Sequence, residues 1–226
     1  MLEIQEFCFH PILHRICLSF KPGSIHGILG PNGSGKTTFL KLIKKIWLPT
    51  QGNIYWNGSP LHEKPLEAIS QVMSLVPQNP QVTFGFTVKE FIEMGCYPKH
   101  TSPTLNDVIE LMDLSPLAGN PMTELSGGEK QRAYIARSMI TEAPIMLLDE
   151  PTANLDIQHQ QTIWKILEEL AQKGKTVIIA THDLYAAKKH CQSVAIFCKG
   201  HCLKQGTFEQ ALTPQNLKEV FGVDKY

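Results

Sequence analysis

The clearest indication of the fold is a glycine-rich motif, Gly30, Pro31, Asn32, Gly33, Ser34, Gly35, Lys36, Thr37 and Thr38. It follows the apolar run Ile25–Leu29, which predicts a buried strand, and it opens an amphipathic segment that predicts a helix from Lys36 to Trp47. In this order of strand, loop and helix, the glycines let successive backbone N–H groups converge on phosphate oxygens, and the helix N-terminus adds partial positive charge. We therefore expect Lys36 to reach the terminal phosphates of a nucleotide and Thr37 to place its hydroxyl on Mg²⁺.

Two carboxylates follow a second apolar run further along the chain. Ile145–Leu148 predicts a buried strand, and Asp149 and Glu150 come directly after it. Ligands of open α/β sheets bind at the carboxyl ends of the strands, so both side chains are expected at the phosphate site. We expect Asp149 to hold Mg²⁺ through water and Glu150 to polarise the attacking water as a general base. The two motifs together indicate a nucleoside triphosphatase.

A second glycine pair begins another predicted helix, Gly128–Thr141. The residues around it are Leu125, Ser126, Gly127, Gly128, Glu129, Lys130, Gln131 and Arg132. Ser-Gly-Gly at a helix N-terminus offers free N–H groups and a hydroxyl, which is a second site suited to an anion. One phosphate loop suffices to bind one triphosphate, so the second site needs a further explanation.

The sequence LSGGEKQR at 125–132 resembles the signature sequence of ATP-binding-cassette (ABC) ATPases. In that family two subunits associate head to tail, and the Ser-Gly-Gly of one closes on the γ-phosphate bound by the other. The resemblance implies a homodimer that holds two ATP molecules, with Ser126, Gly127, Gly128 and Gln131 among the nucleotide-binding residues.

Three further motifs occur in the order of this family, and the resemblance covers essentially the whole chain. Gln78 is similar to the lid glutamine that contacts Mg²⁺ and water. Asp156 is similar to the aspartate that couples the two sites, and His182 to the switch histidine that contacts the γ-phosphate and steadies Glu150. The resemblance therefore implies Glu150, His182 and Gln78 as the catalytic set.

Strands and helices of this length alternate along most of the chain, which predicts an α/β fold with a mostly parallel core sheet. The resemblance is to the P-loop ABC cassette, with an N-terminal antiparallel β subdomain and an inserted helical subdomain. We expect one domain, 1–226, in which 1–80 and 144–226 form the nucleotide-binding core. Residues 81–143 are expected to form the helical subdomain that carries the signature.

The composition argues against several classes of protein. The 226 residues include 21 Lys and Arg and 21 Asp and Glu, so the formal net charge is zero. Binders of a nucleic-acid backbone normally carry a basic excess, so we expect no nucleic-acid partner. No stretch approaches the roughly 20 apolar residues that cross a bilayer, and the acidic start does not fit a signal peptide. The sequence predicts a cytoplasmic protein that needs a partner for any role at a membrane.

Two local patterns concern the residue that would stack on adenine and a cluster of possible metal ligands. The family usually has an aromatic residue near the N-terminus that stacks on adenine, and here Phe9 or His10 could take that position, whereas Phe7 fits the core on strand alternation. Cys198, His201 and Cys202 cluster near the other end of the chain. We interpret this cluster as a β-hairpin rather than a metal site, because it does not fill a tetrahedral ligand set.

Four smaller elements resemble the cassettes of iron-chelate, haem and cobalamin importers: 94–98, 155–160, 181–184 and 212–222. The resemblance implies import of a metal or metal chelate through a separate permease at the cytoplasmic face of the inner membrane, with an extracytoplasmic substrate-binding protein. Zinc and manganese importer cassettes share several of these elements. A soluble ABC ATPase, a non-hydrolysing nucleotide-binding module and a small-molecule kinase are the competing hypotheses.

Overall fold

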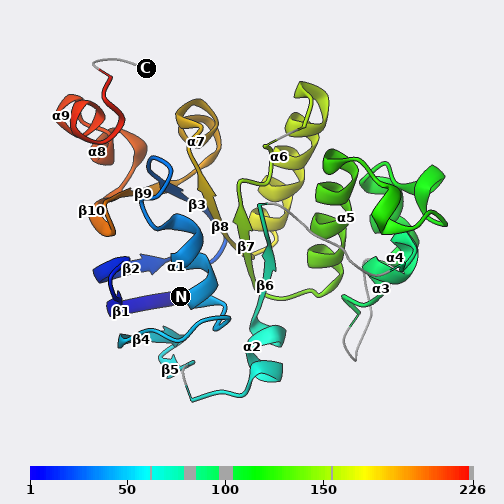
Figure 1. Cartoon of the computed structure of the whole chain (residues 1–226), viewed down its shortest axis with the longest axis horizontal. Coiled ribbons are helices and arrows are strands. Elements are labelled where there is room, and N and C mark those ends of the chain that lie inside the picture. The colour runs from blue at the N-terminus through cyan, green and yellow to red at the C-terminus, as the bar shows by residue number, and fades with distance from the viewer. Residues whose placement is uncertain (62, 79–84, 97–103, 154, 224–226) are drawn as a thin grey trace.

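Two β-sheets form the frame of the molecule (Figure 1). The structure is a computed structural model that describes residues 1–61, 63–78, 85–96, 104–153 and 155–223. The antiparallel sheet has the order β2-β1-β4-β5 and consists of β1 (Leu2–Phe9), β2 (Leu13–Phe20), β4 (Gln51–Trp56) and β5 (Ser59–Pro60). It is the predicted N-terminal antiparallel part, and β4 and β5 form a hairpin at Asn57–Gly58.

The core sheet has six strands in the order β10-β9-β3-β8-β7-β6. Its members are β3 (Ser24–Leu29), β6 (Met73–Val76), β7 (Ile145–Asp149), β8 (Thr176–Thr181), β9 (Ser193–Cys198) and β10 (His201–Gly206). All neighbours pair in parallel except β10, which pairs antiparallel with β9 through the predicted hairpin at Lys199–Gly200. The predicted mostly parallel core sheet is therefore confirmed.

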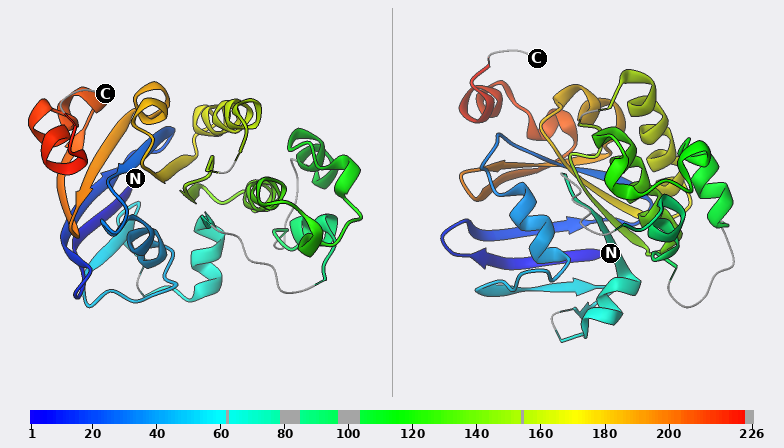
Figure 2. Two further views of the ribbon diagram at one scale, coloured as in Figure 1. Left: turned by 45° about the horizontal axis from the view of Figure 1, so that its top comes forward. Right: turned by 45° about the vertical axis from the view of Figure 1, so that its right-hand side comes forward.

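Two hydrophobic clusters cover the two faces of the core sheet, because successive residues of a strand point to opposite sides. On β7, Met146 and Leu148 belong to one cluster, while Ile145 and Leu147 belong to the other. The first cluster also contains the buried side chains of α3 to α8, and the second contains those of α1 and the antiparallel sheet. Figure 2 shows α3, α4 and α5 gathered on the side away from the antiparallel sheet.

Helices connect the strands of the two sheets. They are α1 (Lys36–Ile43), α2 (Leu66–Val72), α3 (Val88–Glu93), α4 (Leu105–Leu111), α5 (Gly127–Ile140), α6 (Ile157–Gln172), α7 (Leu184–His190), α8 (Phe208–Ala211) and α9 (Pro214–Asn216). Shorter helical turns are η1 (Ser115–Leu117), η2 (Met122–Glu124) and η3 (Leu217–Phe221). Among the described residues, no helix has the length and apolar character needed to cross a membrane.

The end of α1 differs from the sequence prediction, which placed it at Trp47. The helix ends at Ile43, because Lys45 takes a left-handed backbone conformation with φ 61°. Helix α8 was not predicted from the sequence, and neither was α2. The first residue of α2, Leu66, is exposed, so the segment lacks the continuous apolar face by which helices are recognised.

Candidate active site

The loop that joins β3 to α1 passes so close to neighbouring backbone and side chains that it needs glycine. Gly35 caps the N-terminus of α1 with φ 103°, and a β-carbon there would collide with Leu13. A β-carbon on Gly30 would collide with the carbonyl oxygen of Phe197. The hairpin turn also holds the loop, since the Gly200 N–H donates to the Ser34 carbonyl at 3.2 Å. Strands β2 and β9 and the β9–β10 turn thus fix the loop from outside.

Lys36 folds back over this loop. Its Nζ donates to the carbonyl oxygens of Gly30 at 2.7 Å and Pro31 at 3.1 Å. Burial lowers the pKa of Lys36, and the nearby carboxylates of Glu150 and Asp149 act in the opposite direction. The ammonium therefore lies in a partly desolvated position between the loop and the carboxylates, where an anionic phosphate would interact with it strongly.

Asp149 ends β7 beside the start of α1. Its Oδ1 is buried without a hydrogen-bond partner, while the Thr37 side chain hydrogen-bonds to the carboxylate. Burial raises the pKa of Asp149, and the Thr37 hydrogen bond opposes this shift. A buried anionic oxygen without a donor is costly unless a cation completes it.

Glu150 follows in a left-handed backbone conformation, with φ 49° and its N–H bonded to the Ala180 carbonyl at 2.9 Å. His182 Nδ1 lies 2.9 Å from Glu150 Oε1, and the Thr181 hydroxyl donates to Oε2 at 3.3 Å. The Glu150 side chain is only 6% exposed, whereas that of His182 is 64% exposed. The predicted pair is thus brought together, with the carboxylate held in place and the imidazole open to a ligand. Thr181, whose hydroxyl completes the set, was not predicted, although its place at the end of β8 directly before His182 could have indicated it.

Ser126 lies at a different place, at the N-terminus of α5. Its hydroxyl accepts from the Glu129 N–H at 3.3 Å, and the Ser126 N–H donates to Glu129 Oε2 at 2.7 Å, which is a capping box. These hydrogen bonds lower the pKa of Glu129. Ser126 and Gly127 are exposed, and Gln131, one turn further, is buried with Nε2 unpaired.

The helices that carry the two glycine motifs pack on opposite faces of the core sheet. Buried residues of α1 belong to one hydrophobic cluster, and those of α5 belong to the other. Among the described residues, no hydrogen bond joins Ser126, Gly127 or Gly128 to the phosphate loop. The structure of one chain therefore does not bring these predicted nucleotide-binding residues together.

The two remaining predicted site residues lie at the ends of core elements. Gln78 is exposed and follows β6, the neighbour of β7 in the sheet. Asp156 is exposed and caps the N-terminus of α6, where it accepts from the His159 N–H at 2.9 Å. Both lie beyond the carboxyl end of a core strand, β6 for Gln78 and β7 for Asp156.

Phe9 stacks on a residue that was not predicted as part of the site. Its ring lies 5.7 Å from that of Trp47, with 11° between the planes, and Trp47 is 40% exposed because α1 ends before it. Lys41 Nζ lies 4.7 Å from the centre of the Trp47 ring. Phe7 is fully buried, as predicted, and His10 is exposed.

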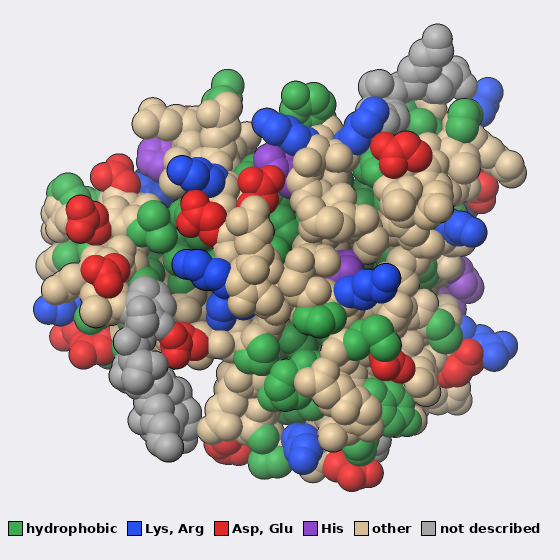
Figure 3. All heavy atoms as spheres, turned by 180° about the vertical axis from the view of Figure 1, so that it is seen from behind, with side chains coloured by type: hydrophobic (Ala, Val, Ile, Leu, Met, Phe, Trp, Pro, Cys, Tyr) green, Lys and Arg blue, Asp and Glu red, His purple; other side chains and the backbone are tan. Residues whose placement is uncertain are grey.

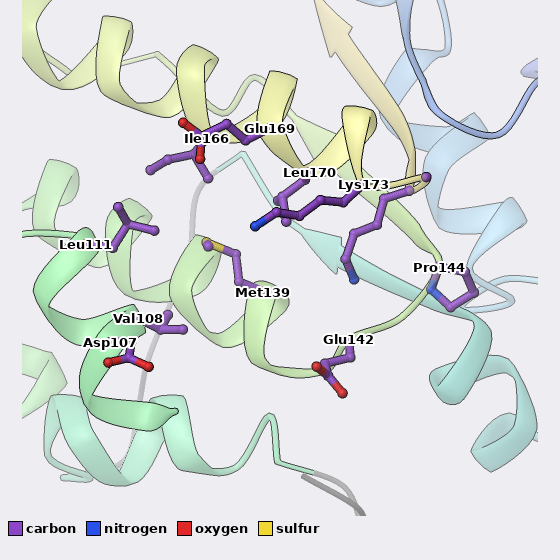
Figure 4. A pocket seen from close by; sticks show the side chains of 12 residues that line it. Asp107, Val108, Leu111, Met139, Glu142, Pro144, Ile166, Glu169, Leu170 and Lys173 are labelled. Atoms are coloured by element: carbon purple, nitrogen blue, oxygen red, sulfur yellow. The ribbon is translucent and has the colours of Figure 1, made fainter. Parts of the chain in front are cut away.

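A pocket of about 600 Å³ lies between α4, α5 and α6, away from these motifs (Figure 4). Apolar residues such as Leu111, Met139 and Ile166 share its lining with charged side chains such as Glu142 and Lys173. Its lining contains none of the predicted site residues, so it is not the nucleotide site. Within the described part of the chain, no group of three or more His, Cys, Asp or Glu side chains is arranged to hold a metal ion.

Comparisons with known proteins agree on one family. The ABC transporter family profile matches residues 13–153. The hemin import ATP-binding protein HmuV of Shewanella denitrificans is 35% identical over 225 residues, which cover 95% of this chain and 89% of the relative. The iron(3+)-hydroxamate import ATP-binding protein FhuC of Bacillus subtilis is 34% identical over 223 residues, covering 94% and 83%. A solved ATP-binding subunit of an ABC transporter shares the fold, with TM-score 0.86 and 23% identity over 100% of this chain and 95% of that one.

Proposed function

Since this chain belongs to the ABC transporter family, we propose that it binds and hydrolyses ATP and thereby energises import of a metal or metal chelate through a separate membrane permease. The observation that carries the proposal is the convergence of three motifs at the carboxyl edge of the core sheet. The phosphate loop follows β3, Asp149 and Glu150 end β7, and Thr181 and His182 end β8. These strands are parallel and adjacent, in the order β3-β8-β7.

The chain's own side chains account for the steps of hydrolysis. The backbone of the phosphate loop and Lys36 hold the β- and γ-phosphates. Glu150 takes the proton of a water whose oxygen attacks the γ-phosphorus, while the bond from that phosphorus to the bridging oxygen breaks and leaves ADP. His182 fixes the Glu150 carboxylate through the 2.9 Å contact and contacts the γ-phosphate with its exposed ring.

The residues around Asp149 fit a magnesium ion. The unpaired buried Oδ1 is a hard anionic oxygen, and the Thr37 hydroxyl hydrogen-bonds to the same carboxylate. Thr37, Asp149 and Gln78 would hold the ion. Mg²⁺ neutralises the charge that develops on phosphate oxygens during transfer.

The positions of the two glycine motifs support a dimer of cassettes. Because α1 and α5 cover opposite faces of the sheet, the exposed Ser126 and Gly127 are open to the phosphate loop of a second copy. A nest at a helix N-terminus binds the γ-phosphate that ADP lacks, so ATP closes the dimer and hydrolysis opens it. In this arrangement, 1–80 and 144–226 serve as the nucleotide-binding core, and 81–143 serve as the helical subdomain.

The two named relatives support a metal chelate as the transported substrate, because one is a hemin importer and the other an iron(3+)-hydroxamate importer. The elements at 155–160, 181–184 and 212–222 add to this, while 97 and 98 of the first such element lie outside the described residues. A cassette does not touch the transported substrate, so selectivity falls to the permease and to an extracytoplasmic binding protein. The cassette itself works at the cytoplasmic face of the membrane.

An exposed apolar segment offers a contact for the permease. Ile46, Trp47 and Leu48 are consecutive and 54%, 40% and 66% exposed, and they lead from α1 to β4. Figure 3 shows hydrophobic side chains gathered on the lower part of the reverse face, the part of the molecule where β4 and α2 lie. Contiguous apolar patches on a protein surface mark sites of interaction with partners.

Co-purification tests the transport role. We expect the tagged chain, extracted gently from native membranes, to recover a multi-spanning permease identified by mass spectrometry. Ile46→Asp should lower this recovery by at least about tenfold, since it places a charge in an apolar contact, and it should leave ATP binding unchanged. Leu203→Asp, also at an exposed position but on β10, is the matched control. Recovery of ribosomes, DNA or the free dimer alone would contradict the transport role and leave the ATPase activity standing.

The aromatic pair gives a second prediction. Phe9→Ala should weaken ATP binding severalfold, because stacking of a base on an aromatic ring contributes about 1–3 kcal/mol. The dissociation constant measured with a fluorescent ATP analogue checks this, and Phe9→Tyr should retain normal affinity. An unchanged constant in Phe9→Ala would move the assignment to His10.

A further inference from the structure

The side chain of Gln160, in the first turn of α6, contacts the backbone of the loop between β7 and α6. Gln160 Nε2 donates to the carbonyl oxygens of Thr152 at 3.2 Å and Leu155 at 3.0 Å. Within the loop, the Leu155 N–H bonds to the Thr152 carbonyl at 3.4 Å, and the Ala153 N–H to the Glu150 carbonyl at 3.2 Å. A side chain therefore fixes the backbone of a loop that connects Glu150 to Asp156.

Both carboxylate oxygens of Asp156, at the end of this loop, contact His159. Oδ1 accepts from the His159 N–H at 2.9 Å, and Oδ2 lies 2.8 Å from His159 Nδ1. The hydrogen bond to the backbone N–H is an ordinary helix cap, but the contact with the ring also holds the second carboxylate oxygen in place. These contacts lower the pKa of Asp156, first through the His159 N–H and then through the ring, with a small contribution from Arg132 on α5.

The opposite nitrogen of the same ring faces the segment that follows α4. His159 Nε2 lies 3.9 Å from Asp113 Oδ2, in the connection between α4 and η1. The His159 side chain is 27% exposed, and that of Asp113 is 77% exposed. One imidazole thus lies between a carboxylate of the loop and a carboxylate of the α3–α5 region.

We infer that His159 is a positioning residue that fixes Asp156 and ties it to the α4 end of the helical region, with Gln160 fixing the loop backbone. We call the His159 and Gln160 contacts to Asp156, Thr152 and Leu155 the loop brace. The segment 155–160 thereby links the position of Asp156 to that of α4. A movement of α4 and its following turn would displace Asp156, which lies six residues from the proposed base. The inference rests on the proposed function for the role of Asp156, and on geometry alone for the brace.

Hydrogen exchange on the full chain tests the brace without relying on activity. His159→Ala and Gln160→Ala should each speed exchange of the Ala153 and Leu155 amides by at least about tenfold, because each variant removes bonds that keep the loop closed. The cap bond to the backbone N–H of residue 159 survives in both variants, so α6 should keep its protection. Gln158→Ala, at an exposed neighbouring position, is the matched control. Unchanged loop exchange in both variants would overturn the inference.

Steady-state turnover tests the link to function. His159→Ala should lower kcat by roughly threefold to tenfold with KM for ATP changed less than about twofold, since the residue acts through Asp156 and not on the nucleotide. His159→Asn, whose amide nitrogen can take the place of Nδ1 but not of Nε2, should restore loop protection and recover kcat only to the level of Asp113→Asn, which should lower kcat without changing loop exchange. An effect on KM alone, or no rescue by Asn, overturns the positioning role. Absence of turnover in the wild type would instead contradict the proposed function, and the exchange measurement would still decide on the brace.

Discussion

Glu150→Gln should bind ATP with near-normal affinity and hydrolyse it at least about a hundredfold more slowly than the wild type. A general base contributes 10²–10⁴-fold, and an amide of the same shape cannot take the proton of the attacking water. The amide can still use the neighbouring groups, because its oxygen can accept from one of His182 and Thr181 while its nitrogen donates to the other. The fold of the site should therefore survive the substitution, and phosphate release measures the loss.

The same variant should accumulate a closed dimer in the presence of ATP. Without hydrolysis, the γ-phosphate that joins the two copies remains in place, so size-exclusion chromatography with ATP should show a dimer and with ADP a monomer. Glu169→Gln, on the exposed face of α6, is the control for loss of a carboxylate. Near-normal turnover by Glu150→Gln would remove Glu150 from the role of base.

Lys36→Ala should weaken ATP binding by at least about thirtyfold, because truncating one partner of a desolvated charge pair costs 2–5 kcal/mol or more. The nucleotide-free protein should lose little stability. Burial lowers the pKa of Lys36, so the folded state disfavours its charged form, and alanine removes that cost together with the bonds to Gly30 and Pro31. Calorimetric titration with ATP and urea unfolding give the two quantities.

Lys89→Ala is the control for this prediction, since Lys89 is exposed on α3, outside the predicted site. A large loss of stability in Lys36→Ala would show that the ammonium mainly holds the empty loop together. Retained ATP affinity would contradict its role at the phosphates.

The parts of the site that the sequence predicts are those set by local geometry. A strand, a glycine loop and a helix place Lys36 and Thr37 wherever they occur, and an apolar strand that ends in Asp149 and Glu150 reaches the same edge of any parallel sheet. His182 was placed beside Glu150 only through the family resemblance, and the structure brings the two to 2.9 Å. Their roles remain predictions for the experiments above.

The features that the sequence did not predict depend on contacts between distant segments. The contact of His159 with Asp113 joins residues on α6 and beyond α4, and no periodic pattern records it. Trp47 was expected inside a helix. The helix ends earlier because Lys45 has a left-handed backbone conformation, and the Trp47 ring stacks on Phe9 instead. Helix α2 is short and begins with an exposed leucine, so its hydrophobic pattern is too weak to recognise.

The hydrophobic cluster on one face of the core sheet continues without interruption from the strands through α5 and α6 into α3 and α4. Val88 and Val108 belong to the same cluster as Leu148 and Val177. A cut that removed 85–143 would expose the part of that sheet face that α5 covers beside β6, so the helical region is no detachable module. On heating, the chain should melt as one cooperative unit. Any compound bound to the folded chain, at the phosphate loop or at the pocket beside α4, then raises a single melting temperature. A thermal-shift screen would therefore report ligands of every site on this molecule with one readout.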